Sequence, residues 1–255
     1  MDKIKRYRCF MKSNLGGMLA IETDVEESDQ EKGLPRPPLQ KPRPGDASIV
    51  PLPGFDGIEL KRDKIIDIIT RRRSHRKYNQ EPLSFEELSY LLWATQGVHK
   101  VIDNDYASLR SVPSAGARHP FETYLVVNNV KGLEKGLYRY LPFDNGLLSM
   151  GRVEELEDKL DKATLGQIFV AKSAVVFIWS CIPYRNEWRY HIGGHKPMLI
   201  DAGHLCQNLY LACESIQCGT CAIAAYNQIL MDNLIGADGD DEFVVYMSPV
   251  GRIDI

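Results

Sequence analysis

The sequence predicts one α+β domain that follows a proline-rich arm. Segments typical of helices and of strands are intermixed along the 255 residues but do not alternate regularly, which disfavours a doubly wound parallel sheet. Apolar residues make up 44% of the chain and charged residues 25%, as in an ordinary globular protein. A chain of this length buries on the order of 70–75% of the surface that it exposes when unfolded, so it needs no disulfide bonds to fold.

The first 57 residues differ in composition from the rest. Half of the fourteen prolines lie between Pro35 and Pro53, and proline keeps this stretch out of helices and central strands. We therefore divide the chain into an extended arm (1–57) and a domain (58–255). The arm is either a disordered tail or a segment that wraps over the body or over a partner subunit. Its apolar residues favour wrapping: Leu34, Leu39, Ile49, Val50, Leu52 and Phe55.

Two helices are predicted on either side of the short loop 74–81. The first begins near Lys61 and carries an apolar face of four isoleucines, Ile65, Ile66, Ile68 and Ile69. The second opens with a capping box, in which Ser84 is the N-cap and Glu87 stands at the third helical position. It continues toward Gly97, a residue type that commonly ends helices.

The rest of the chain supplies the strands of the expected sheet. Asn145 and Gly146 separate two β-rich runs, 137–143 and 147–151, which is a strong signal for a hairpin. Further strands are expected at 121–128, 173–182, 220–226 and 242–250. Further helices are expected at 154–163 and 199–216, the second of them rich in small and apolar residues.

The overall charge argues against a nucleic-acid-binding protein. The net charge is -3 and the isoelectric point is about 6.1, whereas such binding normally rests on a basic field. The N-terminus lacks the apolar core of a secretory signal, and the longest apolar stretch, 174–182, is too short to span a bilayer. We expect a cytoplasmic protein that acts on a small molecule and binds neither nucleic acid nor membrane.

Six cysteines are present: Cys9, Cys181, Cys206, Cys213, Cys218 and Cys221. Without an export signal, reduced thiols are the default expectation. Cys218 and Cys221 form a C-x-x-C pattern, which fits a redox pair or half of a metal site. Because no second such pair and no histidine pair at zinc spacing accompanies it, we favour a structural role for the cysteines and expect no metal.

Phosphate recognition is the best interpretation of one basic segment. The glycine loops of dinucleotide and P-loop sites are absent from the sequence, as are G-x-S-x-G and H-E-x-x-H. Arg72 and Arg76 instead flank the hydroxyl of Ser74, and two guanidinium forks with a hydroxyl between them suit a phosphate monoester. A solvated basic end of a helix is the alternative.

Three further segments have a composition suited to a flat ligand. The loop 113–120 places small residues between two prolines, and glycine lets a backbone approach a ligand closely. The segment 219–227 includes Ala224 and Ala225, whose backbone amides are little shielded by side chains. The segment 249–252 adds a cation, Arg252, near the C-terminus.

Together with the second predicted helix and the long helix, these segments resemble the nitroreductase family of FMN enzymes. The pieces that carry the resemblance are, in order, RRRSHRKY, LSYLLWATQGV, SVPSAGARHP, DAGHLCQNLYLA and GTCAIAAYN. The similarity runs from about Lys61 to Arg252 and is greatest to the SagB-type branch, which includes dehydrogenases that oxidise azolines in ribosomal peptides. It implies a central antiparallel sheet flanked by helices, in an intertwined homodimer with active sites at the interface.

The resemblance also implies the residues that hold the cofactor. The arginine–serine group, joined by 251–252, binds the phosphate and ribityl end of FMN. The loop 113–116 reaches the flavin from the other subunit, and the backbone of 224–225 lies near the flavin N5 and O4. The implied residues are Arg72, Ser74, Arg76, Pro113, Ser114, Ala115, Gly116, Ala224, Ala225, Gly251 and Arg252.

The reaction that the resemblance implies is a ping-pong hydride transfer. NAD(P)H, the co-substrate, reduces the flavin at N5, and a nitro compound, quinone or similar conjugated acceptor then takes two electrons. The catalytic proton donor is not identified, and the candidates are Arg189, Tyr190 and His191. Azoline dehydrogenases of this branch carry a Lys-Tyr pair here, whereas Arg189 keeps its proton at physiological pH and is a poor general base.

Three alternatives stay open at this point. The first is a SagB-type flavin dehydrogenase that oxidises a peptide-derived or heterocyclic substrate. The second is a flavin-binding partner subunit without independent turnover. The third is a metal- or thiol-dependent protein built on the four cysteines between 206 and 221.

Overall fold

The computed structural model of the protein describes residues 4, 8, 10–12, 27–45, 47–151 and 153–254. Its centre is a seven-stranded sheet in the order β1-β6-β5-β4-β7-β9-β8, and each of its ladders is antiparallel. The strands are β1 (Ile49–Pro51), β4 (Phe121–Val127), β5 (Gly136–Leu141), β6 (Gly146–Ser149), β7 (Val175–Cys181), β8 (Cys218–Thr220) and β9 (Phe243–Arg252). A separate hairpin pairs β2 (Val98–Ile102) with β3 (Ala107–Arg110). The predicted fold class, α+β with a central antiparallel sheet flanked by helices, is confirmed.

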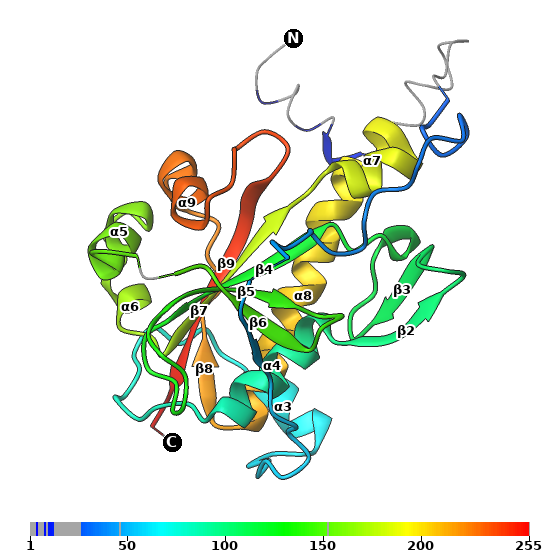
Figure 1. Ribbon diagram of the computed structural model, residues 1–255. Helices are drawn as coiled ribbons and strands as arrows, with labels where there is room; N and C mark the ends of the chain where they lie inside the picture. Colours follow the sequence, from blue (N-terminus) through cyan, green and yellow to red (C-terminus); the bar gives the residue numbers. More distant parts are fainter. Residues whose placement is uncertain are drawn as a thin grey trace.

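Helices cover both faces of the sheet (Figure 1). On one face α4 (Phe85–Gln96) and the 21-residue α8 (His195–Ser215) pack into a large core. On the other face α5 (Leu156–Ala163), α6 (Ile168–Ala171) and α9 (Gln228–Ile235) enclose a smaller one. Because both faces are covered, every residue of the central strands β4 and β7 is buried, which explains why β7 is almost wholly apolar in sequence.

Two local sequence signals form the structures that they predict. Ser84 Oγ accepts a hydrogen bond from the backbone N–H of Glu87 at 3.1 Å, and the Glu87 carboxylate accepts one from Ser84 N–H at 2.8 Å. This capping box starts α4, which ends before Gly97 as expected. Asn145, at φ 45°, turns the chain between β5 and β6, because asparagine tolerates the left-handed conformation that a tight hairpin requires.

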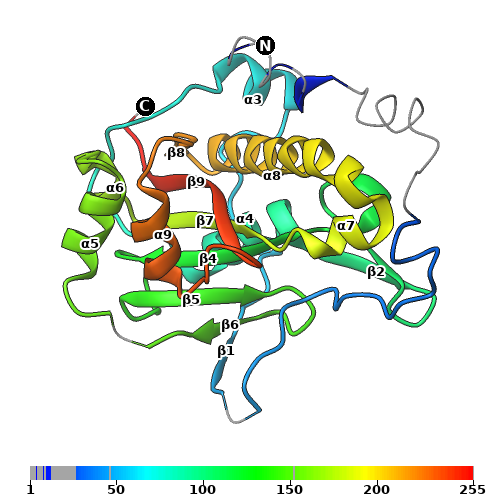
Figure 2. The ribbon, with the colours of Figure 1, turned by 90° about the horizontal axis from the view of Figure 1, so that it is seen from above.

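The described part of the arm lies along the body. Its strand β1 pairs with β6 at the edge of the sheet (Figure 2), where a strand tolerates proline, and Leu52 is buried in the larger core. Backbone carbonyls of Leu39 and Pro42 accept hydrogen bonds from the buried side chains of Arg110 and Arg139, both at 2.8 Å. Wrapping over the body therefore describes residues 27–45 and 47–57; residues 1–26 lie largely outside the described part.

Buried charges anchor the arm to the ends of the central strands. Lys41 N–H donates to Glu122 at 2.8 Å, and the Lys41 ammonium forms an ion pair with Glu242. Glu122 is also paired with Arg185 at 2.5 Å, with both side chains only 3% exposed. The Glu242 carboxylate accepts further hydrogen bonds from Tyr124 and Ser180. Since each buried carboxylate meets a cation, these contacts fix the path of the arm.

One expected strand was wrong. The strand predicted at 220–226 ends at Thr220, the last residue of β8, and beyond it only Ile223 bridges to Met247 of β9. The backbone N–H of Ala222 donates to the side chain of Tyr210 instead of to a strand, at 2.8 Å. The hairpin β2–β3 and the short helices α7 (Tyr184–Tyr190) and α9 were not predicted.

The first predicted helix begins at Ile65, four residues after its expected start at Lys61, and most of its apolar face is exposed. It is α3 (Ile65–Arg71), which packs beside the C-terminal half of α8 (Figure 2). Ile68 is buried, but Ile65, Ile66 and Ile69 are 60%, 67% and 56% exposed. Single exposed apolar side chains are common, whereas these three together form an apolar patch on one short helix. Among the described residues, the structure has no helix of the length and hydrophobicity needed to cross a membrane.

Candidate functional site

The basic segment 72–76 lies against the C-terminal half of α8. The guanidinium of Arg72 stacks over the ring of Tyr210, 5.4 Å from its centroid. Ser74 Oγ is 3.0 Å from the Tyr210 hydroxyl, which also accepts the N–H of Ala222. A tyrosine hydroxyl that accepts one hydrogen bond still has its own proton to donate, so Tyr210 joins Ser74 to the segment that contains Ala222.

Two paired glycines of the sheet allow the close approach of the end of this segment and of the residues that follow it. Gly219 of β8 stands opposite Gly251 of β9. A Cβ atom on Gly219 would lie 2.6 Å from the Cβ of His75, and one on Gly251 would lie 2.6 Å from the ring of Tyr78. Gly251 therefore lies beneath the ring of Tyr78, and the glycine pair allows residues 75–78 to rest directly on the sheet.

Beyond the bridge at Ile223, two predicted residues are exposed. Ala224 and Ala225 lie at the surface, and Ala225 is fixed by its carbonyl, which accepts a hydrogen bond from Gln167 at 2.9 Å. The backbone N–H groups of both alanines have no hydrogen-bond partner among the described residues. This segment therefore presents two adjacent donors at the surface, two and three residues beyond Ala222, which Tyr210 connects to Ser74.

The loop 113–116 lies near the other end of α8. Ser114 Oγ donates to Asp201 Oδ2 at 2.6 Å, and Ala115 N–H donates to the same oxygen at 3.1 Å. Ser114 Oγ also accepts the N–H of His119 at 2.9 Å. Burial raises the pKa of Asp201, and the hydrogen bonds from Ser114 and Ala115 partly oppose the rise. Asp201 thus holds the loop in one conformation, while Pro113 stays exposed.

The same loop contacts two of the candidate catalytic residues. Gly116 has φ 60°, and a Cβ atom there would lie 2.4 Å from the Tyr190 hydroxyl and 3.2 Å from Cδ of Arg189. Arg189 Nη1 donates to the Tyr106 hydroxyl at 3.1 Å. His191, the third candidate, follows Tyr190 with φ 48° and ψ −141°, a backbone region that residues other than glycine rarely occupy.

The predicted residues therefore form two groups within one chain. The first contains Arg72, Ser74 and Arg76, connected through Tyr210 to the segment that continues to Ala224 and Ala225. The second contains the loop 113–116 with Arg189 and Tyr190. Their contacts on α8, Tyr210 and Asp201, are nine positions apart, or about 13.5 Å along a helix axis.

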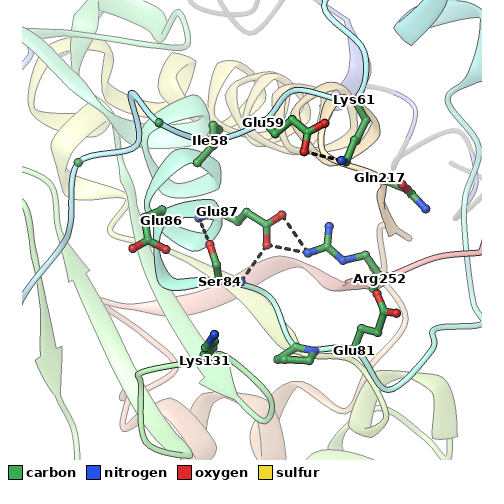
Figure 3. Close-up of a pocket in the computed structure, with 13 residues that line it drawn as sticks. Ile58, Glu59, Lys61, Glu81, Ser84, Glu86, Glu87, Lys131, Gln217 and Arg252 are labelled. Carbon is green, nitrogen blue, oxygen red and sulfur yellow. Dashed lines mark hydrogen bonds and ion pairs between the residues drawn. The ribbon is translucent and has the colours of Figure 1, made fainter.

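Arg252 lies apart from both groups, in a cleft of about 680 Å³ beside the N-terminus of α4 (Figure 3). Its guanidinium donates to both carboxylate oxygens of Glu87, at 2.7 and 2.9 Å, and to the carbonyl of Ile216 at 2.7 Å. In Figure 3 these two side chains point toward one another across the cleft. The structure does not bring Arg252 together with Arg72.

The described cysteines are free thiols in a nonreactive environment. Cys181, Cys206, Cys213, Cys218 and Cys221 are all buried, and Cys9 lies outside the described residues. Burial raises the pKa of Cys206 and of Cys218 to about 12, so neither is a thiolate at neutral pH. Within the described ranges, no group of three metal-binding side chains comes together. These observations favour a structural role for the cysteines.

Asp201, Tyr210, Tyr106 and Arg118 were given no role from sequence. Asp201 and Tyr210 belong to the quoted segment DAGHLCQNLYLA, which provided the signal, although its spacing alone does not say what either side chain contacts. Tyr106 and Arg118 lie on irregular segments without a periodic pattern. Only the fold places them next to Gly116 and Arg189.

The first group fits the phosphate and ring of a flavin mononucleotide. Neither Arg72 nor Arg76 has a carboxylate partner among the described residues. Two cations that lack ion-pair partners, together with a hydroxyl group, suit a phosphate dianion. The two unbonded amides at Ala224 and Ala225 suit acceptor atoms at the edge of a ring.

The central antiparallel sheet between two layers of helices defines a nitroreductase-like α+β protein, and comparison with known proteins agrees. The model of the nitroreductase family matches residues 69–252, and the chain belongs to that family. It is 32% identical over 208 residues to a protein of Methanocaldococcus jannaschii named "Putative nitroreductase MJ1384", covering 82% of this chain and 98% of that one.

Solved structures show the same fold. A structure from Anabaena variabilis named as a "putative nitroreductase" superposes with a TM-score of 0.66 and 23% identity. The match covers 82% of this chain and 42% of that longer one. The microcin synthetase McbBCD complex of Escherichia coli, with truncated pro-MccB17 bound, gives a TM-score of 0.60 at 17% identity, over 83% and 80% of the two chains. The NADPH:FMN oxidoreductase of Vibrio harveyi in complex with NAD⁺ gives 0.53 at 17% identity, over 75% and 69%.

Proposed function

We propose that the protein is an FMN-dependent oxidoreductase that takes a hydride from NAD(P)H and reduces a small conjugated acceptor, such as a nitro compound or a quinone. The observation that carries the proposal is the first group: unpaired Arg72 and Arg76, the hydroxyl of Ser74 and the unbonded amides of Ala224 and Ala225, in a chain of the nitroreductase family. The resemblance of the fold to an NADPH:FMN oxidoreductase supports both cofactors.

Each element of the first group has its own task in this proposal. Arg72 and Arg76 bind the phosphate, and the ring of Tyr210 keeps the Arg72 guanidinium in place while its hydroxyl orients Ser74. The amides of Ala224 and Ala225 donate to the edge of the isoalloxazine ring. When bound, FMN supplies the hydride and electron transfer. The fixed amides and cations favour a negative charge on the reduced ring without reorganisation.

We propose a homodimer because the two groups are separated within one chain. The second group, on the loop 113–116, completes the site of the partner subunit. Apolar residues exposed on two neighbouring helices support such an interface: Ile65, Ile66 and Ile69 on α3, with Leu199 and Ile200 on α8. Burial of these side chains against a second copy contributes the usual hydrophobic stabilisation, about 25 cal/mol per Å².

A SagB-type dehydrogenase is the second candidate. The fold resemblance to the McbBCD microcin synthetase complex favours it. Arg189, beside the loop 113–116, argues against azoline oxidation by the same mechanism, because it stands where azoline dehydrogenases carry a lysine and is a poor general base. In this candidate the substrate donates the hydride, and Tyr190 is the side chain placed to move a proton. A flavin-binding subunit of a larger assembly, without turnover of its own, is consistent with the same resemblance.

The visible absorption spectrum of the purified protein separates these candidates. Oxidised-flavin bands near one FMN per chain that bleach on anaerobic addition of NADPH or NADH support the reductase. Bands that persist with both nucleotides but bleach with a heterocyclic peptide support the dehydrogenase. Absence of flavin after reconstitution with FMN excludes both.

The phosphate site is tested by the double variant R72A/R76A. We expect it to fold and to lose FMN, because the phosphate then lacks both guanidinium partners. A double variant with full occupancy contradicts the proposed position. The variant Arg252→Gln tests whether Arg252 also binds the phosphate. If Arg252 serves only the ion pair with Glu87, the variant loses stability but keeps FMN. If Arg252 binds the phosphate, FMN occupancy falls as well.

A further inference from the structure

Three arginines converge beside the loop 113–116. Arg118 lies beneath the loop, 2% exposed, and its Nε donates to the carbonyl of Gly116 at 3.3 Å. Arg189 reaches the same loop from α7. Arg36, from the arm, donates to the carbonyl of Asn104 in the β2–β3 turn. Burial lowers the pKa of Arg118, and the charges of Arg189 and Arg36 lower it further.

These cations are held by aromatic and carbonyl groups instead of by carboxylates. Arg118 stacks over the rings of Tyr106 and Trp188, at 5.1 and 5.5 Å, and Arg189 over that of Tyr190 at 5.4 Å. Among the described residues, neither these two arginines nor Arg36 forms an ion pair.

Three carboxylates, on α7, on α8 and in the arm, are engaged elsewhere. Asp201 accepts hydrogen bonds from Ser114 and Ala115. Asp29 is paired with Lys32 and accepts from the Tyr184 hydroxyl. Glu187, on the same helix as Arg189, is paired with His195 at 2.6 Å. Partly buried cations without a counter-charge produce a positive potential that attracts an anion.

We propose that Arg189 is a specificity-determining residue that binds an anionic group, a carboxylate, on the electron-accepting substrate. The inference rests on the proposed function, because it needs the loop 113–116 to lie at a flavin site. Arg118 is too buried to touch a substrate and contributes its field. Arg189 is half-buried. Among the described residues only the Tyr106 hydroxyl accepts one of its guanidinium N–H groups, so the fork keeps donors for a carboxylate.

The arm positions this arginine. Gln30 Nε2 donates to the Tyr106 hydroxyl at 2.9 Å, the same oxygen that accepts from Arg189. Gln30 N–H donates to the carbonyl of Trp188 at 2.8 Å, and the Trp188 indole donates to the carbonyl of Leu34 at 3.0 Å. The arm thereby fixes both the helix that carries Arg189 and the hydroxyl that orients it.

The test compares two acceptors that differ in charge but little in shape, 4-nitrobenzoate and 4-nitrobenzamide. With either one, NADPH gives a hydride and solvent gives a proton, and the nitro group becomes a nitroso group with release of one water. We expect the FMN-loaded protein to favour the benzoate by about tenfold in kcat/KM, the order of magnitude of a charge-assisted hydrogen bond. Arg189→Gln should bring the ratio of the two kcat/KM values close to one, and Arg189→Lys should keep part of the preference.

Arg43→Gln is the matched control. It removes an arm arginine whose only ion pair among the described residues is a partly exposed one with Asp144 at 3.6 Å. It should leave the ratio unchanged. Equal kcat/KM for the two acceptors in the unaltered protein overturns the inference, as does an equal effect of Arg189→Gln on both.

The anion that Arg189 binds could also be a phosphate of the nucleotide. Stopped-flow measurement of flavin reduction by NADPH and by NADH distinguishes this source from the acceptor carboxylate. A slower reduction of the flavin in Arg189→Gln, with the acceptor ratio intact, places the anion on the donor and also overturns the inference. Failure of the proposed function is distinct: the unaltered protein then holds no flavin or reduces neither nitro compound.

Discussion

At the residue scale, the contact between Gly116 and Tyr190 links the loop to α7. Gly116 has a positive φ, and the Tyr190 hydroxyl occupies the space of a side chain. Glycine is therefore required twice, by the backbone conformation and by the close approach. Replacement of a single hydrogen by a methyl group consequently tests how tightly the loop is held.

Gly116→Ala should lower the free energy of unfolding by about 1–3 kcal/mol, because strain at positive φ adds to a steric clash. Gly132→Ala is the control: its φ is 84°, but no atom lies within 4 Å of the added Cβ, so it reports the backbone strain alone. Tyr190→Phe should restore part of the loss in Gly116→Ala by removing the nearest oxygen. Urea unfolding measures all four proteins, and equal losses in the two glycine variants would argue against the clash.

His119 makes stability depend on pH. Burial lowers the pKa of His119 to about 3, and the charges of Arg110, Arg118 and Arg185 add to the effect. Between about pH 6.5 and 3 the unfolded chain therefore binds a proton that the folded chain does not. Stability is complete above that range and falls as the pH is lowered, by at most about 1.4 kcal/mol per pH unit from this residue.

His119→Gln removes the titrating group and keeps a donor for the carbonyl of Ser108, which lies 3.0 Å from His119 Nε2. The variant should show a smaller decline in the free energy of unfolding between pH 6 and pH 4, measured by urea titration at each pH. An identical slope in the two proteins excludes His119 as its source.

At the element scale, the strand pair β8–β9 supports residues 72–78, which include the proposed phosphate site. The facing glycines 219 and 251 create a flat area, and Tyr78 covers it while its hydroxyl donates to the carbonyl of His75 at 2.8 Å. Residues 75–78 can thus rest on the two strands because Gly219 and Gly251 have no side chains. A strand position that accepts alanine elsewhere in the sheet should reject it here.

Gly251→Ala should destabilise the fold by about 1–3 kcal/mol through overpacking against Tyr78 and should weaken FMN binding by displacing 72–78. In the control Gly136→Ala, at the start of β5, the added Cβ has its nearest neighbours at 3.6 Å, so stability should change little. Thermal melting and flavin fluorescence measure the two effects. Unchanged FMN affinity in a destabilised Gly251→Ala would separate the strand pair from the site.

At the scale of the whole molecule, the apolar residues exposed on α3 and α8 form the proposed dimer interface. A charged side chain on an exposed position costs the monomer little, but it prevents burial against a second copy. The oligomeric state therefore reports on these positions without unfolding the protein.

The double variant I66E/I200E should convert a dimer into a folded monomer and lower flavin occupancy, because the loop 113–116 of the partner is lost. Met150→Glu is the control. Met150 is 41% exposed and follows β6, which lies near one end of the sheet, whereas β8 and β9 lie at the other end. Light scattering after size exclusion gives the mass. A dimer that persists in the double variant contradicts the proposed interface.

The sequence alone determined the elements whose signals are local. The capping box at Ser84, the Asn145 turn and the apolar runs of β4 and β7 each depend on neighbouring residues, and each formed where expected. The order of motifs along the chain likewise identified the family. Local signals failed at 220–226, because a distant side chain, Tyr210, takes the backbone donor that a strand would use.

Only the tertiary structure decided which side chains meet. Ser114 with Asp201, and Arg189 with Gly116, are pairs far apart in sequence, and no pattern of spacing encodes their contact. The same holds for Arg252, which sequence grouped with Arg72 and the fold pairs with Glu87. Periodicity fixes the face of an element on which a residue lies, whereas its partner depends on how that face packs against the rest of the chain.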